Sequence, residues 1–188
     1  DLLLATTTGT ESLSSTPRVL PGCGKTGEYW VLVYTNSGEH KAFLVTASGI
    51  GAPVISKLGF TFNDASTQST FSPNGSKYAM TRPYDKSPAI FDFDRATGQL
   101  SNMIDLGITG YAYSLQFSPN GELLYVSTSS SGLWQFDVTQ SDIVSTRTQV
   151  YSGAAPLGTM ARAEDGKIYI ARMGSTDLGV INNPDVSG

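Results

Sequence analysis

Cysteine and histidine are almost absent from this sequence: its 188 residues contain one of each, Cys23 and His40. A lone cysteine cannot form a disulfide within the chain or build a cysteine-based zinc site. A lone histidine excludes any site that needs two imidazoles. His40 stands between Glu39 and Lys41 in a polar stretch, which predicts a histidine on the surface.

Charged residues are also scarce, at 15% of the chain, and the formal net charge is −4. Such a chain lacks the basic surface that binds a phosphate backbone, so we expect no nucleic-acid partner. No apolar run is long enough to span a bilayer, so we expect no membrane insertion. No stretch places apolar residues at helical spacing over three turns. The missing helical pattern makes an all-β chain the expectation.

What the sequence does contain is a repeat. "FSPNGSKYAM" begins at Phe71 and "FSPNGELLYV" begins at Phe117, 46 residues later. A weaker copy, "EDGKIYIAR", begins at Glu164, and "GKTGEYWVLVY" begins at Gly24. The corresponding glycines are separated by 48, 46 and 45 residues and are Gly27, Gly75, Gly121 and Gly166. A period of this length is typical of repeat architectures.

Each copy predicts a hairpin turn that leads into a strand. Asn-Gly and Asp-Gly pairs favour tight turns because both residues tolerate positive φ, and β-forming residues follow each pair. The preceding proline suits the entrance to a turn, where its missing N–H removes no ladder bond. We therefore expect positive φ at the glycines of three pairs: Asn74-Gly75, Asn120-Gly121 and Asp165-Gly166.

Further strands follow in each unit after polar breaks, such as "AIFDFDRATG" and "LWQFDVTQSD", and the last strands are "PVISKLG", "LSNMIDLG" and "TQVYSG". Four short antiparallel strands in each unit of 40–50 residues predict the blades of a β-propeller. A solenoid and a β-sandwich are the alternatives, but a sandwich has no reason to repeat a sequence every 46 residues. The predicted blades are residues 11–59, 60–107, 108–153 and 154–188, with residues 1–10 as the last strand of a preceding blade.

Two aspartates are weak candidates for a metal site. "DFDRATG" places Asp92 and Asp94 on one face of a strand, where both carboxylates could meet a cation. The spacing matches a calcium loop only in part, because Ala96 and Thr97 stand where a ligand and a glycine are needed. Two solvated carboxylates at the end of a strand are the favoured interpretation. We expect no cofactor.

Aromatic side chains are candidates for ligand contacts, because loops at the face of a propeller often form binding surfaces. Tyr84, Tyr111, Tyr113 and Trp134 could stack on sugars or peptides. Packing between neighbouring blades is the favoured alternative for aromatic residues at repeated positions.

The blade pattern resembles the WD40-like, YVTN-type propeller regions of secreted Bacteroidetes proteins. Such proteins carry gliding-motility-associated or type IX secretion C-terminal domains. "DGKIYIAR" followed by "LGVINNPD" is the most specific match, and the resemblance extends from Glu11 to the end of the chain. It implies a secreted or cell-surface protein and a larger ring of seven or eight blades. The remaining blades, or a second copy, would then be partners of this segment.

Two classes of function follow from these residues. The first is a non-catalytic module that binds a protein or carbohydrate ligand, for recognition, adhesion or display. The second is a propeller enzyme of the lactonase type, which uses metal-binding carboxylates and histidines at the central channel. The sequence has few residues suited to the second class, so the first is the expectation, with no catalytic residues.

Overall fold

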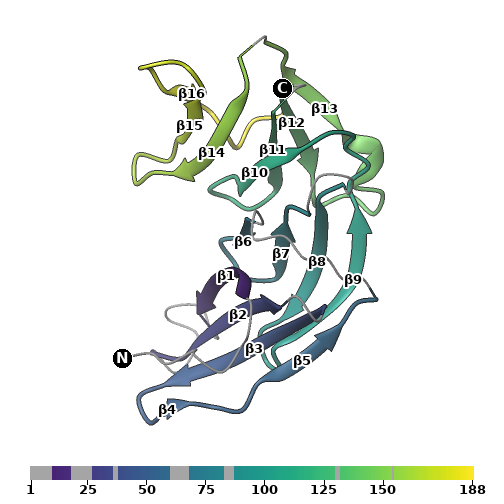
Figure 1. Cartoon of the computed structure of the whole chain (residues 1–188), viewed down its shortest axis with the longest axis vertical. Coiled ribbons are helices and arrows are strands. Elements are labelled where there is room, and N and C mark those ends of the chain that lie inside the picture. Colours follow the sequence, from purple (N-terminus) through teal and green to yellow (C-terminus); the bar gives the residue numbers. More distant parts are fainter. Residues whose placement is uncertain are drawn as a thin grey trace.

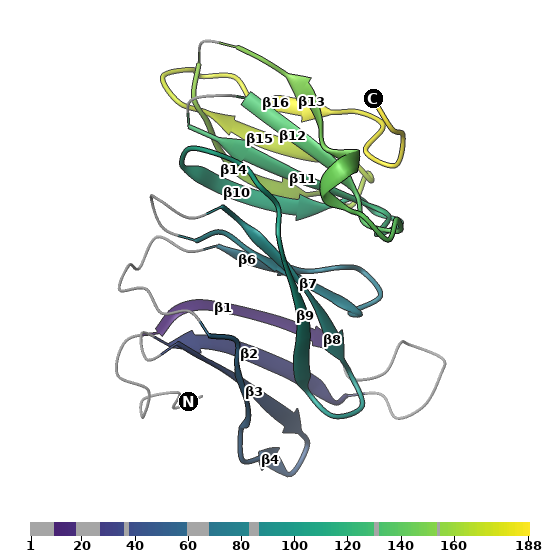
Figure 2. The same cartoon turned by 90° about the vertical axis from the view of Figure 1, so that its right-hand side faces the viewer.

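The computed structural model of the chain describes residues 10–17, 27–35, 38–59, 68–82, 87–129, 132–153 and 155–188. Regular structure in these residues consists of strands and one short 3-10 helix, η1 (Val144–Thr146), and the strands form four antiparallel sheets. The sheets follow one another along a curved path (Figure 1) and stack face to face (Figure 2). This is a propeller arrangement, so the predicted all-β fold built from blades is confirmed.

In each sheet, called a blade below, strands pair mostly in the order of the chain. The first blade contains β1 (Thr10–Pro17), β2 (Tyr29–Thr35), β3 (Glu39–Thr46), β4 (Gly49–Ile50) and β5 (Val54–Lys57), with both β4 and β5 paired to β3. The second contains β6 (Ser69–Phe71), β7 (Lys77–Met80), β8 (Ala89–Asp94) and β9 (Gln99–Asp105). The third contains β10 (Ala112–Phe117), β11 (Leu123–Thr128), β12 (Gly132–Asp137) and β13 (Thr148–Tyr151). The fourth contains β14 (Leu157–Arg162), β15 (Ile168–Arg172) and β16 (Gly179–Ile181).

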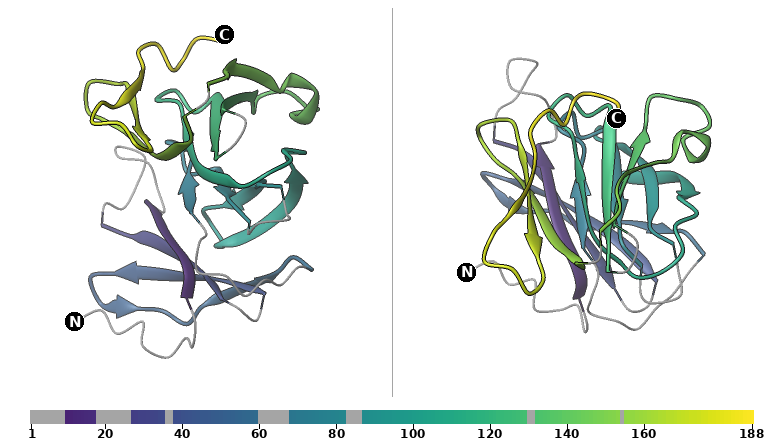
Figure 3. Two further views of the ribbon diagram at one scale, coloured as in Figure 1. Left: turned by 45° about the horizontal axis from the view of Figure 1, so that its top comes forward. Right: turned by 90° about the horizontal axis from the view of Figure 1, so that it is seen from above.

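The first strands of the blades lie next to one another. Contacts join β1 to β6, β6 to β10, and β10 to β14. Figure 3 shows the four blades arranged around this inner row of strands. Within the described part of the chain, no helix is long and apolar enough to cross a membrane.

Apolar residues fill the spaces between successive blades. The middle strand β11 shows how, because side chains alternate between the two faces of a strand. Leu124 and Val126 belong to the core shared with the second blade, whereas Leu123 and Tyr125 belong to the core shared with the fourth. A strand buried on both faces needs a continuous apolar run, and each large side chain contributes about 2 kcal/mol by leaving water. The run "LLYV" is therefore what a blade between two neighbours requires.

The repeated turn has the predicted positive φ at its glycines, and the structure shows which residues close it. Gly75, Gly121 and Gly166 have positive φ of 68°, 79° and 78°, as predicted. Asn102, however, is the only non-glycine residue with positive φ in the described chain, so Asn74 and Asn120 do not share that conformation. The turn is therefore not a two-residue turn with positive φ at both Asn and Gly. Its carbonyl acceptor is Ser72, which bonds the Gly75 N–H at 2.8 Å, because Pro73 already supplies the first bend.

The serine and asparagine side chains explain why the whole motif repeats. Ser118 Oγ donates to Asn120 Oδ1 at 2.7 Å and accepts the N–H of Leu123 at 3.0 Å. Asn120 Oδ1 also accepts the N–H of Glu122 at 2.9 Å. Ser72, Asn74 and Lys77 repeat the same pattern in the second blade. Local bonds of this kind hold a turn without help from the core.

The first blade does not use this short turn. Gly27 has a φ of 94°, but it ends a connection of residues 18–28, most of which lie outside the described residues. Of residues 1–10, for which we expected the last strand of a preceding blade, residues 1–9 also lie outside the described residues. Thr10 already belongs to β1.

His40 is not on the surface, and that prediction is wrong. It is fully buried on β3, on the same face as Ala42, between the first and second blades. Its ring lies 4.8 Å from Tyr34, 5.9 Å from Tyr78 and 5.6 Å from Phe91, measured between centroids. Burial lowers the pKa of His40 from 6.5 to about 3, so the ring is neutral at ordinary pH.

Candidate functional site

The two candidate metal-binding aspartates have other partners. Asp92 accepts hydrogen bonds from Lys77 Nζ at 2.5 Å and Asn102 Nδ2 at 2.6 Å. Partial burial raises the pKa of Asp92, but these donors outweigh it and leave the pKa below its usual value. Within the described chain, no three His, Cys, Asp or Glu residues gather in a way that could hold a metal ion.

Asp94 is part of a turn. Its carboxylate accepts the Thr97 hydroxyl at 2.7 Å and the Ala96 N–H at 2.8 Å. The hydrogen bond from Thr97, followed by that from Ala96, lowers the pKa of Asp94. Asp137 makes the same contacts with the N–H and hydroxyl of Thr139, at 2.9 and 2.6 Å, at the equivalent corner of the third blade. Asp94 therefore closes the hairpin between β8 and β9.

The candidate aromatic residues separate into two groups. Tyr111 and Tyr113 are half-buried at the start of the inner strand β10 and contact each other edge to face, with centroids 5.9 Å apart. Trp134 packs against the core between the second and third blades, and the Arg147 guanidinium lies over its ring at 5.2 Å. Trp134 thus packs between blades, as the alternative interpretation states. Tyr84 lies outside the described residues.

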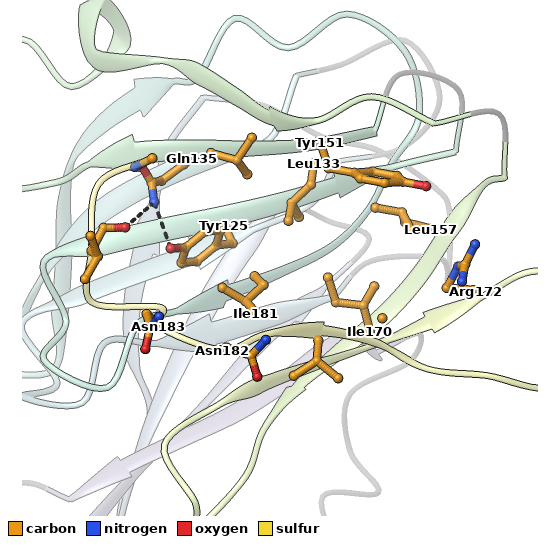
Figure 4. A pocket seen from close by; sticks show the side chains of 15 residues that line it. Tyr125, Leu133, Gln135, Tyr151, Leu157, Ile170, Arg172, Ile181, Asn182 and Asn183 are labelled. Atoms are coloured by element: carbon orange, nitrogen blue, oxygen red, sulfur yellow. Dashed lines mark hydrogen bonds between the residues drawn. The ribbon is translucent and has the colours of Figure 1, made fainter.

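A pocket of about 480 Å³ opens between the third and fourth blades. Figure 4 shows it from close by. Its apolar lining is continuous with the core between these blades, which includes Leu133, Leu157 and Ile170. The residues around it are Tyr125, Leu133, Gln135, Val150, Tyr151, Leu157, Ile170, Arg172, Gly179, Val180, Ile181, Asn182, Asn183, Val186 and Gly188. The volume falls in the range of small-ligand pockets, whose walls are mostly apolar with a few polar groups.

One wall of the pocket is held by a buried amide. Gln135 Nε2 donates to the Tyr125 hydroxyl at 2.7 Å and to the Val186 carbonyl at 3.1 Å. The Tyr125 hydroxyl donates in turn to the Pro184 carbonyl at 2.9 Å, and Gly188 N–H donates to Gln135 Oε1 at 3.2 Å. These bonds hold residues 182–188, here called the terminal strap, against the third blade. Burial raises the pKa of Tyr125, so its hydroxyl stays protonated.

The other side of the pocket carries groups suited to a ligand. Arg172 lies at its edge (Figure 4). It forms no ion pair with an acidic residue of the described chain. Asn182 and Asn183 add amide groups, and Tyr151 is 40% exposed. The side chains that line the pocket include no carboxylate, imidazole or thiol. The arrangement suits binding of a ligand with apolar surface and an anionic group.

The sequence analysis did not identify this pocket. Arg172 and Gln135 stand within strand motifs, where each is one polar residue in an apolar run. The pocket exists because two blades leave a gap, and a gap between blades has no local sequence pattern. One signal was available in the sequence: Arg172 follows Lys167 by five residues, as Arg82 follows Lys77 in the second blade.

Comparison with known proteins supports the fold. No protein-family model and no curated protein sequence matches the chain. Among solved structures, the β-propeller domain of Swd1 from Myceliophteria thermophila is similar, with a TM-score of 0.59 and 12% identity over 92% of this chain and 53% of that one. A protein of unknown function from Bacteroides thetaiotaomicron gives a TM-score of 0.58 and 14% identity over 95% of this chain and 42% of that one. The chain thus spans about half the length of these structures, and the likeness shows the fold alone.

Proposed function

We propose that this chain is a non-catalytic binding module whose ligand, a protein or a carbohydrate, is recognised at the pocket between the third and fourth blades. The observation that carries the proposal is the pocket itself: an apolar floor with Tyr151, Arg172 and two asparagines at its edge. Tyrosine and arginine are enriched at binding surfaces because each combines a large contact area with polar groups.

The lactonase alternative gains little support from the described residues. It requires several carboxylates and histidines around one cation, whereas Asp92 and Asp94 bond to other donors and His40 is buried among aromatic rings. We therefore propose that the chain has no catalytic centre.

We further propose that the chain forms part of a larger ring in a secreted or cell-surface protein, as its resemblance to exported YVTN-type propellers implies. The outer face of the first blade supports a larger ring. Tyr29 pairs with Val45, and Val31 pairs with Phe43, so these apolar side chains share the face opposite the core. Tyr29 is 47% exposed. In a propeller, such a face packs against another blade.

A ligand screen with matched variants tests the proposed function. The purified chain is applied to glycan and protein arrays, and each ligand found is titrated against Tyr151→Ala and Tyr29→Ala, two tyrosines of similar exposure. We expect Tyr151→Ala to weaken binding at least about tenfold and Tyr29→Ala to leave it unchanged. Equal affinity in both variants would refute the pocket as the site. Turnover of a lactone that depends on a bound metal would favour the enzyme.

A further inference from the structure

Two of the repeated turns contain an Asn-Gly pair, Asn74-Gly75 in the second blade and Asn120-Gly121 in the third. Such a pair can lose ammonia without an enzyme. The peptide nitrogen of the glycine gives its proton to hydroxide and attacks the asparagine side-chain carbon Cγ, and Nδ2 leaves as ammonia. Water then opens the cyclic imide to aspartate, or to isoaspartate, in which the main chain runs through the side chain. Both asparagines are exposed, so water reaches each of them.

The two turns are closed in the same way. Gly75 N–H donates to the Ser72 carbonyl at 2.8 Å, and Gly121 N–H donates to the Ser118 carbonyl at 3.0 Å. Each of these bonds has to open before the glycine nitrogen can react. Each asparagine Oδ1 also accepts the hydroxyl of its serine, at 2.7 Å in both turns. A difference in reactivity between the two pairs therefore has to come from the groups around them.

At Asn74, an arginine stabilises the anion that reacts. Arg95 Nη1 donates to the main-chain carbonyl of Asn74. That carbonyl and the Gly75 nitrogen belong to one peptide group, so loss of the Gly75 proton spreads negative charge onto the oxygen that Arg95 contacts. A guanidinium beside a developing anion lowers the free energy needed to form it. Arg95 is itself positioned by the first blade, because its carbonyl accepts Trp30 Nε1–H at 2.8 Å.

The side-chain carbonyl of Asn74 accepts three hydrogen bonds. They come from the Ser72 hydroxyl at 2.7 Å, the Ser76 N–H at 3.0 Å and the Ser76 hydroxyl at 2.8 Å. When the nitrogen attacks Cγ, negative charge develops on this oxygen, and donors that are already in place stabilise it as an oxyanion hole does. Nδ2 of Asn74 bonds to none of the described residues, so nothing among them retains the departing ammonia.

The groups around Asn120 oppose the same reaction. Its Nδ2 donates to the Glu122 carboxylate at 3.0 Å, and its main-chain N–H donates to the Asp185 carboxylate at 2.9 Å. Two nearby carboxylates disfavour a further negative charge. Oδ1 accepts two hydrogen bonds, from the Ser118 hydroxyl and the Glu122 N–H. Within the described chain, no donor reaches the main-chain carbonyl of Asn120.

We propose that Asn74 is a modification site: the groups around it promote deamidation of Asn74-Gly75 through a cyclic imide, whereas those around Asn120 suppress it. The Arg95 guanidinium and the donors on Oδ1 act on the two oxygens where negative charge develops. The turn of the second blade therefore acquires a carboxylate as the protein ages, and the turn of the third does not. The reaction consumes only water and depends on neither a ligand nor a partner.

The fourth blade shows that the aspartate product fits the turn. Asp165 stands there in place of the asparagine, and its Oδ1 accepts the Lys167 N–H at 3.1 Å. Gly166 N–H donates to the Ala163 carbonyl at 3.1 Å, so the turn is closed as in the other blades. Isoaspartate instead adds a carbon to the main chain, so this product should open the turn.

Ageing of the folded protein tests the proposal. The purified 188-residue chain is incubated at mildly alkaline pH, and peptide mapping by mass spectrometry follows deamidation at each asparagine. We expect Asn74 to deamidate at least about tenfold faster than Asn120. In the urea-unfolded chain the two rates should become similar, because both pairs are Asn-Gly. Equal rates in the folded chain, or an unchanged ratio after unfolding, would overturn the proposal.

Substitutions separate stabilisation of charge from closure of the turn. Arg95→Gln should slow deamidation of Asn74 about tenfold and leave Asn120 unchanged, whereas Arg162→Gln, at an exposed arginine of the fourth blade, should change neither rate. Glu122→Ser gives the third-blade turn the Asn-Gly-Ser sequence of the second and should speed deamidation of Asn120. An unchanged or faster rate at Asn74 in Arg95→Gln would mean that the arginine only holds the turn closed, and the proposal would fail. Melting temperatures verify that each variant is folded.

Discussion

At the scale of single residues, His40 is the group whose chemistry depends most on blade packing. Nothing in "NSGEHKAF" indicates burial, because the charged residues Glu39 and Lys41 flank the histidine. Successive side chains of β3 point to opposite faces of the sheet. Glu39 and Lys41 therefore form an ion pair on one face, whereas His40 points into the core on the other. The Nε2 atom lies 3.3 Å from Met80 Sδ. A buried neutral imidazole links the stability of the chain to pH.

We expect stability to fall as the pH falls below the pKa of an unfolded histidine. With a folded pKa of about 3 and a usual value of 6.5, the unfolded chain binds the proton first. The free energy of unfolding should then decrease by up to about 1.4 kcal/mol per pH unit below 6.5. Urea unfolding at pH 7, 6 and 5 measures this slope above the range where carboxylates titrate. His40→Phe, which cannot titrate, should be nearly flat, and an equal slope in this variant would contradict the assignment.

The turn glycines allow a second test at this scale. Gly121 and Gly166 have nearly the same φ, but a Cβ at Gly121 would lie 3.1 Å from Pro73 Cδ of the second blade, whereas one at Gly166 would meet nothing within 4 Å. Valine at Gly166 should cost about 1–2 kcal/mol from backbone strain alone. Valine at Gly121 should lower the free energy of unfolding further, because its side chain would also press on Pro73 in the turn of the second blade. Thermal unfolding of both variants measures the difference, and unchanged melting temperatures would contradict the turn assignment.

At the scale of elements, the sequence predicted what is local and missed what depends on neighbouring blades. Turn, strand and period all follow from "SPNG" and the apolar run after it, because Ser118 and Asn120 make their bonds within five residues. The turn role of Asp94 is equally local, through Thr97. His40 is buried, and Arg172 lies at the edge of the pocket, only because a neighbouring blade packs beside each of them. The residues next to them in the sequence do not indicate either position.

At the scale of the whole molecule, the outer face of the first blade carries exposed apolar side chains. It presents Tyr29 and Ile55, which are 47% and 44% exposed. Exposed apolar faces of this kind favour association.

We expect the 188-residue chain to associate in solution as its concentration rises. Light scattering over a concentration series measures the molar mass, and Tyr29→Lys with Ile55→Lys should shift the chain toward monomer by charging the first-blade face. A folded, strictly monomeric wild-type chain at high concentration would refute the larger ring and favour closure with four blades.

The pairing of nearly every strand with its neighbour in sequence also bears on how the chain folds as it leaves the ribosome. Hairpins closed by five-residue turns lose little entropy, because the cost of closing a loop grows with its length. A blade can therefore complete its hydrogen bonds soon after its last strand emerges, before the next blade exists. Its apolar face then stays exposed until the following blade is made, so we expect the blades to assemble in the order of synthesis, each one serving as the template for the next.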